Sequence, residues 1–141
     1  EKLREKERNW VKTKNHIFSR EVIKCALKVG AGTIHLEKLK NIGKDSDGSI
    51  EESKKYVLRN WSYYELQSMI EYKAKMEGIV VKYVNPAYTS QTCSFCGQIG
   101  ERSSQSVFKC LNPNCTEYGK EANADYNAAR NIANSKEIVN K

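Results

Sequence analysis

Cys93-Ser94-Phe95-Cys96-Gly97 and Cys110-Leu111-Asn112-Pro113-Asn114-Cys115 are two short cysteine pairs that decide how the second half of the chain folds. A pair, a spacer and a second pair are typical of a zinc ribbon, in which two turns each supply two thiolates to one tetrahedral ion. Glycine directly after the first pair suits a tight turn, because glycine tolerates positive φ. The alternative is two disulfides in a secreted protein, but no signal-peptide pattern favours secretion. We therefore expect structural zinc on Cys93, Cys96, Cys110 and Cys115.

Length and composition limit the class of protein. The chain has 141 residues, of which 39% are hydrophobic, and a formal net charge of +7. This length suggests one domain or slightly more, with a modest core to which zinc could add folding free energy. The basic charge fits a nucleic-acid partner, and no apolar run approaches transmembrane length, so no membrane partner is expected. The fifth cysteine, Cys25, is expected to be a buried, inert thiol.

The first half of the chain predicts a helix, a strand, a helix and a strand. Residues 1–29 have a helical pattern, and residues 33–37 alternate like a strand that ends at Glu37. Residues 38–60 are interpreted as a polar, flexible connection. A second helix is expected to start near Asn60 or Ser62, with a capping box formed by Ser62 and Glu65, and residues 79–84 are expected to form a strand. This order predicts a parallel βαβ unit that places Glu37 at a carboxyl end of the sheet.

Two helix faces are also predicted from apolar spacing. In the first helix Trp10, Ile17, Val22 and Ala26 recur at near-helical spacing, with Phe18 and Leu27 beside them. In the last helix, which is expected to begin at about Asn123, Asp125 shares a face with Ala128, Ala129 and Ile132. Because that face is otherwise small and apolar, Asp125 is expected on the packed side of the helix.

Three stretches carry a family resemblance. They are Gly32-Thr33-Ile34-His35-Leu36-Glu37-Lys38-Leu39, Tyr83 to Gly97 (YVNPAYTSQTCSFCG) and Ala124 to Ile132 (ADYNAARNI). Together, in this order, they resemble the C-terminal half of the RuvC-like nuclease domain of TnpB proteins and the miniature type V CRISPR effectors. The stretches Tyr72-Lys73-Ala74-Lys75 and Asn123 to Ile132 favour the CRISPR branch.

The resemblance implies an α/β fold, namely a partial RNase H-like (RuvC) domain with an inserted four-cysteine zinc ribbon. Residues 1–84 would be the RuvC-like segment, residues 85–121 the target-nucleic-acid-binding zinc ribbon, and residues 122–141 the final RuvC helix. Glu37 and Asp125 match the second and third catalytic acids, which bind magnesium, whereas no strand upstream of Glu37 supplies the first aspartate.

The implied function is the C-terminal part of an RNA-guided DNA endonuclease that cleaves target DNA by two-magnesium chemistry. The implied partners are guide RNA, target DNA and a missing N-terminal part of the same protein, in the cytoplasm of a prokaryote. A homodimer is possible, because the family includes both dimeric and monomeric members. This chain alone is expected to be inactive.

The alternative function is a non-catalytic nucleic-acid-binding module, in which the ribbon and its basic surroundings bind a strand and the two acids are structural. The expected phosphate contacts are Arg102, Lys109, Lys120 and Arg130, and the expected stacking rings are Phe95, Phe108 or Tyr118. A solvated basic surface explains each of these cations equally well. An assay with the upstream polypeptide added distinguishes the two hypotheses. Magnesium-dependent nicking supports the nuclease, and binding without cleavage supports the binding module. A third hypothesis is a zinc-ribbon adaptor that binds protein partners.

Overall fold

The structure, a computed structural model, describes residues 2–38 and 50–140, with side chains for residues 5–38 and 62–140. Its elements are, in order, α1 (Lys2–Lys28), β1 (Thr33–Glu37), α2 (Ile50–Met76), β2 (Val80–Val84), β3 (Val107–Lys109), β4 (Glu121–Asn123), α3 (Ala124–Asn134) and β5 (Ile138–Val139). The chain divides into a helical unit (Glu1–Ile34 with Leu39–Lys82) and a cysteine unit (His35–Lys38 with Tyr83–Lys141). No helix in residues 2–38 and 50–140 is long and apolar enough to cross a bilayer.

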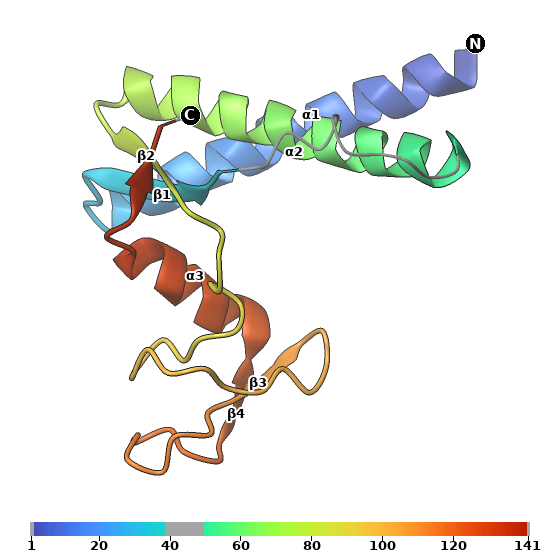
Figure 1. The fold of residues 1–141 in the computed structure, drawn as a ribbon. Coiled ribbons are helices and arrows are strands. Elements are labelled where there is room, and N and C mark those ends of the chain that lie inside the picture. The colour runs from blue at the N-terminus through green and yellow to red at the C-terminus, as the bar shows by residue number, and fades with distance from the viewer. Residues whose placement is uncertain (1, 39–49, 141) are drawn as a thin grey trace. The chain divides into compact units, whose positions relative to one another are not determined.

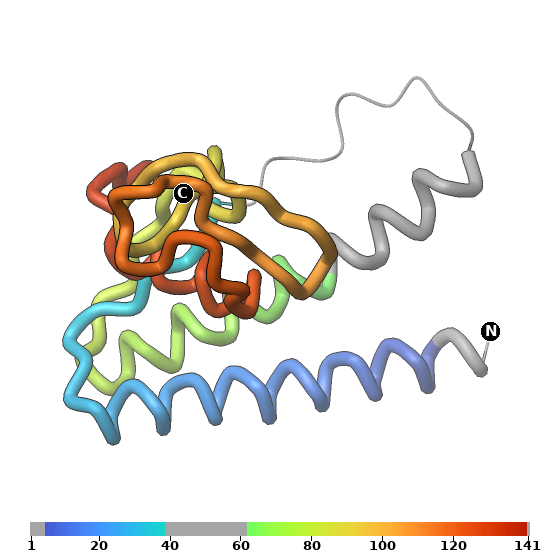
Figure 2. Tube along the Cα trace, turned by 90° about the horizontal axis from the view of Figure 1, so that it is seen from below, coloured from blue at the N-terminus to red at the C-terminus, as the bar shows by residue number. Residues whose placement is uncertain are grey.

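In the helical unit, α1 and the described part of α2 lie side by side (Figure 1, Figure 2). The first predicted helix is confirmed. The second begins at Ile50, so the prediction of a flexible connection through residue 60 was wrong for residues 50–60. That stretch contains no glycine or proline and is rich in Glu, Lys, Leu and Arg, which are good helix formers. Residues 39–49 of the predicted connection lie outside the described residues.

The packed face of α1 differs from the predicted apolar stripe. Among residues 5–28 of α1, the buried ones are Asn15, Ser19, Ile23 and Ala26. Of the predicted stripe only Ala26 is buried, whereas Trp10 is 63% exposed. Cys25 is also exposed, which corrects the expectation of a buried thiol. The packed face therefore combines the apolar Ile23 and Ala26 with the polar Asn15 and Ser19, and the two polar residues form hydrogen bonds to α2.

Asn15 and Ser19 make those bonds. Asn15 Nδ2 donates to Glu65 Oε2 at 2.9 Å and to the carbonyl of Ser62 at 3.2 Å. Ser62 and Glu65 therefore lie inside α2 and contact α1, and the predicted capping box was wrong. Lys73 Nζ donates to Ser19 Oγ at 2.6 Å, and burial together with the charge of Arg20 lowers the Lys73 pKa.

The strands β1, β2 and β5 form one sheet in the order β1-β2-β5. The amide of Val80 donates to Gly32 and the amide of Lys38 donates to Val84, at 3.0 and 2.9 Å. Pairing that advances along both chains together is parallel, which confirms the predicted βαβ unit. β5 adds antiparallel to β2 and was not predicted, because two residues are too few to give a strand pattern.

In the cysteine unit, β3 and β4 pair antiparallel, with Phe108 opposite Ala122. Around them folds the cysteine-bearing segment (residues 91–123), drawn in yellow to orange in Figure 1. α3 follows β4 directly, and its N-cap Asn123 accepts a hydrogen bond from the amide of Tyr126 at 2.9 Å. The predicted start of the last helix is therefore confirmed.

Candidate functional site

The four cysteines of the two pairs come together. The Sγ atoms of Cys93, Cys96, Cys110 and Cys115 all lie within 4.8 Å of one another, and Cys96 and Cys110 are 3.8 Å apart. Zinc–sulfur bonds of about 2.3 Å in a tetrahedron separate neighbouring sulfurs by roughly 3.8 Å. This cysteine cluster therefore has the donor chemistry and the spacing for one zinc ion.

Local turns produce the cluster. The Gly97 amide donates to the Cys93 carbonyl at 2.8 Å, and Gly97 has a φ of 72°, which favours glycine. In the second pair, the Cys115 amide donates to the Asn112 carbonyl at 3.0 Å. The longer second pair thus forms a wider turn around Pro113 while its last cysteine stays in the cluster.

The cysteine environments differ in ways that matter for metal binding. A hydrogen bond from the backbone of Gln98 is the main cause that lowers the pKa of Cys96 to about 7, whereas burial raises the pKa of Cys110 to about 12. Zinc binds thiolates and so releases protons from such thiols. Near neutral pH the thiolate fraction is therefore larger at Cys96 than at Cys110.

Asp125 lies in the first turn of α3, but not on its packed face. Ala124 and Asn127 are buried, whereas the Asp125 side chain is 84% exposed. Two residues along a helix correspond to about 200° of rotation, so Asp125 and Asn127 lie on opposite sides. The expectation that Asp125 faces the packed side was wrong because the packed face carries asparagines, which apolar spacing does not count. The carboxylate instead contacts Arg102 Nη2 at 3.6 Å.

Glu37 is the last residue of β1 and belongs to the cysteine unit together with Asp125. Its Oε1 accepts a hydrogen bond from Thr89 Oγ1 at 2.5 Å. Nearby, His35 Nδ1 donates to the Ile132 carbonyl at 3.0 Å. The role of Glu37 and Asp125 as one magnesium site stays a prediction.

The four predicted phosphate contacts have different surroundings. Arg102 also donates to the Gln105 carbonyl, and Lys120 pairs with Glu117 at 3.1 Å. Lys109 is half-buried and lies opposite Glu121 in the β3–β4 pair. Exposed ion pairs contribute only about 0–1 kcal/mol, so the Arg102–Asp125 and Lys120–Glu117 pairs are weak.

Of the four predicted phosphate contacts, Arg130 lies beside two aromatic rings. Its guanidinium carbon lies 4.2 Å from the ring centre of Phe95 and 6.0 Å from that of Tyr126. Phe95 and Tyr126 are 55% and 65% exposed. Phe108, by contrast, is 2% exposed and packs with the cysteine cluster, so the expectation that it stacks a base was wrong. Tyr118 is exposed.

Three residues that the sequence reasoning missed connect these parts. Asn127 and Asn131 of α3 bond to the backbone of residues 89–94, and Thr89 bonds Glu37. The available signal was the spacing of Ala124, Asn127, Ala128 and Asn131, which is a helical stripe once asparagine is counted as a packing residue.

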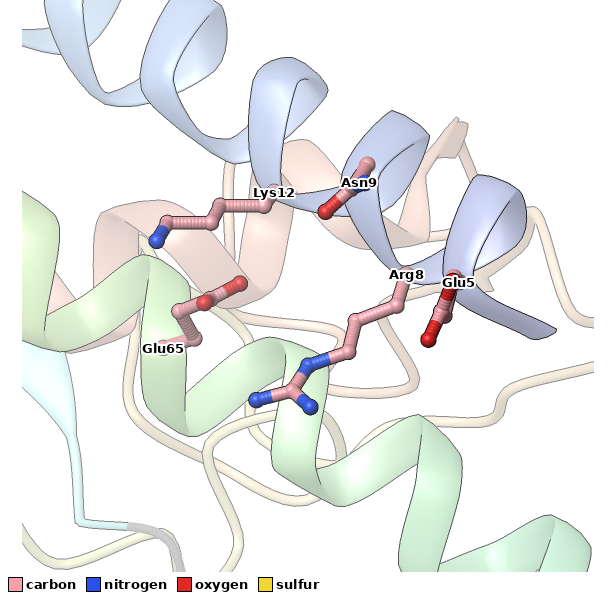
Figure 3. Close-up of a pocket in the computed structure, with 5 residues that line it drawn as sticks. All are labelled: Glu5, Arg8, Asn9, Lys12 and Glu65. Atoms are coloured by element: carbon pink, nitrogen blue, oxygen red, sulfur yellow. The ribbon is translucent and has the colours of Figure 1, made fainter. Parts of the chain in front are cut away.

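A polar pocket of about 300 Å³ lies in the helical unit. Of the described residues, it is lined by Glu5, Arg8, Asn9, Lys12 and Glu65 (Figure 3). Arg8 and Lys12 extend from α1 toward α2, where Glu65 lies (Figure 3). The lining mixes both signs of charge and includes none of the predicted site residues, so it does not indicate a ligand class.

Comparisons with known proteins place this arrangement in a family. Residues 63–132 match the family described as "Cas12f1-like, TNB domain". The CRISPR-associated endodeoxyribonuclease Cas12f1 of Sulfoacidibacillus thermotolerans is 47% identical over 135 residues, covering 94% of this chain and 29% of that relative. The TnpB-like protein MJ0751 of Methanocaldococcus jannaschii is 36% identical over 114 residues, covering 81% of this chain and 40% of that protein.

The fold gives the same result. A cryo-EM structure of a Cas12f1–sgRNA–target DNA complex contains a chain that matches with a TM-score of 0.71 and 30% identity, covering 95% of this chain and 36% of that one. The chain thus spans about a third of the proteins it matches. Sequence and fold agree over nearly all of it, and the chain therefore belongs to the family of miniature type V CRISPR effectors and TnpB-like proteins.

Proposed function

We propose that this chain forms the C-terminal, catalytic part of an RNA-guided DNA endonuclease, with Glu37 and Asp125 as two of its catalytic acids. The observation that supports this most is that both acids and the cysteine cluster belong to one compact unit of a chain from this family. Since the chain spans only 29% of the Cas12f1 relative, we assign the first aspartate and the guide-binding regions to the rest of the protein.

The chemistry of the two acids suits this role. Carboxylate oxygens are the ligands that magnesium prefers, and a bound magnesium pair activates water and stabilises the leaving oxygen of a phosphodiester. In this chain Thr89 orients the Glu37 carboxylate, and Arg102 supplies positive charge beside Asp125. We propose that Arg102 attracts the phosphate that is to be cleaved.

Substitution of the acids in the full-length protein with its guide tests the proposal. Asp125→Ala or Glu37→Ala should abolish cleavage while guided DNA binding persists, because binding rests on base pairing and backbone contacts. Glu121→Ala, an exposed acid of β4, is the matched control and should cut normally. A protein that still cuts with Asp125→Ala would support the non-catalytic binding module instead. The 141-residue chain alone should cut little or not at all.

The ring-and-cation surface supports a single-strand contact in the same protein. We propose that Phe95, Tyr126 and Arg130 stack on bases and contact phosphate, with Arg102, Lys109 and Lys120 as further phosphate contacts. Stacking on aromatic rings contributes about 1–3 kcal/mol per base, and each lost phosphate contact flattens the salt dependence of binding.

Arg130→Glu should weaken single-stranded DNA binding and reduce its salt slope. Lys136→Glu, an exposed cation of the cysteine unit outside the proposed surface, should change neither quantity comparably. If both charge reversals weakened binding equally, the binding would depend on the net positive charge of the protein and not on this surface. Whether one copy or two copies of the protein assemble on a guide is measured by the mass of the guide-bound complex. On the basis of the bacterial and archaeal relatives, we also propose a prokaryotic cytoplasmic location.

A further inference from the structure

A chain of hydrogen bonds connects the first cysteine pair with α3. The Asn127 side chain is 4% exposed. Its Oδ1 accepts from the Ser94 amide at 2.9 Å, and its Nδ2 donates to the Thr92 carbonyl at 2.7 Å. One amide therefore binds the backbone on both sides of Cys93, which belongs to the cysteine cluster.

The same chain continues to the carboxylate of β1. Asn131, one turn after Asn127, donates from Nδ2 to the carbonyls of Thr92 and Thr89, both at 2.8 Å. The Thr89 hydroxyl in turn donates to Glu37. The segment 89–94 thus contains a cysteine of the cluster near one end, and at the other end it is hydrogen-bonded to a predicted catalytic carboxylate. All of these residues lie in the cysteine unit.

Buried amides fix a helix more strictly than apolar side chains do. Leucine or alanine in these places tolerates a small rotation of the helix, whereas a buried amide that loses its bonds is strongly disfavoured. Sliding α3 by one residue would turn it by about 100° and shift it by about 1.5 Å, and would break every bond of Asn127 and Asn131. The rotation of α3 sets where Asp125 points, because Asp125 is two residues before Asn127.

We propose that Asn127, Asn131 and Thr89 are positioning residues that hold Asp125 and Glu37 in a fixed relation to the zinc-bound first cysteine pair. The proposal rests on the proposed nuclease function. It assigns the zinc site a second task beyond binding nucleic acid, since the metal that orders residues 93–96 also orders the segment that orients both acids.

The test uses the full-length protein with its guide, zinc and target DNA. Asn127→Leu removes both amide bonds at similar size, and Thr89→Val removes only the hydroxyl that orients Glu37. Loss of a residue that orients metal ligands typically reduces metal affinity or activity by 10–100-fold. We expect the single-turnover cleavage rate at a fixed magnesium concentration to fall by about that factor in both variants.

A purely structural role would not move the magnesium dependence, so the second readout is the magnesium concentration that gives half-maximal cleavage. It should rise several-fold in Asn127→Leu and Thr89→Val, while zinc content and guided DNA binding stay within about twofold of the parent protein. Thr89→Ser retains the hydroxyl and should restore both the rate and the magnesium dependence. Asn134→Ala, an exposed asparagine at the end of α3, is the control and should behave as the parent.

Two results would overturn the proposal. The first is parental cleavage and magnesium dependence in both Asn127→Leu and Thr89→Val. The second is a loss of cleavage that only follows a loss of zinc or of DNA binding. Asp125→Ala in the same assay separates the failures: if it is inactive while the positioning variants cut normally, only the positioning role fails. If Asp125→Ala itself cuts, the proposed function and the positioning role both fail.

Discussion

Replacement of Gly100 by alanine tests the packing that supports the cysteine cluster. A Cβ at this position would lie 2.5 Å from the Lys109 carbonyl oxygen and 2.5 Å from Cζ of the Phe108 ring. Neither neighbour can move away easily. Lys109 and Glu101 exchange backbone hydrogen bonds of 2.9 and 2.8 Å, and the Phe108 ring is enclosed beside the cysteines. Overpacking of this kind destabilises a folded core by about 1–3 kcal/mol.

Small zinc sites fold together with their metal, so we expect that free energy to appear as weaker zinc binding by the cysteine cluster. A cost of about 1–3 kcal/mol corresponds to a roughly 5- to 150-fold weaker zinc affinity, at about 1.4 kcal/mol per factor of ten. The affinity is measured by competition of the zinc-loaded protein with a chromophoric chelator.

Gly32→Ala is the matched control for Gly100→Ala. A Cβ at Gly32 would meet no atom within 4 Å, and Gly32 does not adopt a left-handed φ. It should leave zinc affinity within about twofold, and it tends to stabilise the fold by restricting the unfolded chain. If Gly100→Ala kept both the zinc affinity and the melting temperature of the parent, the packing of Phe108 against this glycine would not support the metal site.

Three further outcomes follow from the same contacts. Cys96→Ser should leave the purified protein with less than one zinc per chain, and a full zinc content by elemental analysis would exclude the four-cysteine site. After zinc removal at about pH 7, iodoacetamide should alkylate Cys96 before Cys110, because a lowered pKa leaves more thiolate and a raised pKa leaves less. Bound zinc should protect both cysteines, whereas Cys25 should react with or without zinc. Equal alkylation rates for Cys96 and Cys110 would contradict the difference in their environments. Ser19→Ala should lower the free energy of unfolding by about 1.5–3 kcal/mol, because it removes a part-buried bond from a lysine ammonium and a buried bond to the Asn15 carbonyl. Thr13→Ala removes only an exposed hydroxyl bond and should cost less than about 0.5 kcal/mol, so similar losses would contradict this account.

The features that the sequence predicted well are those that local chemistry determines. Two cysteines in one turn must project their sulfurs from the same short loop, and Gly97 adopts the positive φ that its position suggested. The same applies to the start of α3, where Asn123 caps the helix through its own side chain. Such features depend on neighbours within a few residues, and the rest of the chain changes them little.

Helix faces could not be predicted in the same way. Apolar spacing selected Trp10 and Ile17 in α1, yet these two are exposed, and Asn15 and Ser19 are buried and form side-chain hydrogen bonds with α2. A polar residue in the middle of a helix counts as solvent-facing unless its bonding partner is known. For Asn15 that partner is Glu65, 50 residues further along the chain.

The acids of the proposed nuclease site show why this error matters for function. Asp125 was selected through its family motif and through an apolar face, and only the second argument failed. The residues that orient it are the asparagines of the opposite face, and their bonds reach the segment beside the first cysteine pair. Each side-chain amide is hydrogen-bonded to backbone groups more than 30 residues earlier in the sequence. A local sequence pattern therefore cannot predict that these asparagines are packed. A stripe of one buried and one half-buried asparagine beside the first cysteine turn is therefore evidence for a positioning role, and it is recognised only once the fold has brought its hydrogen-bond partners together.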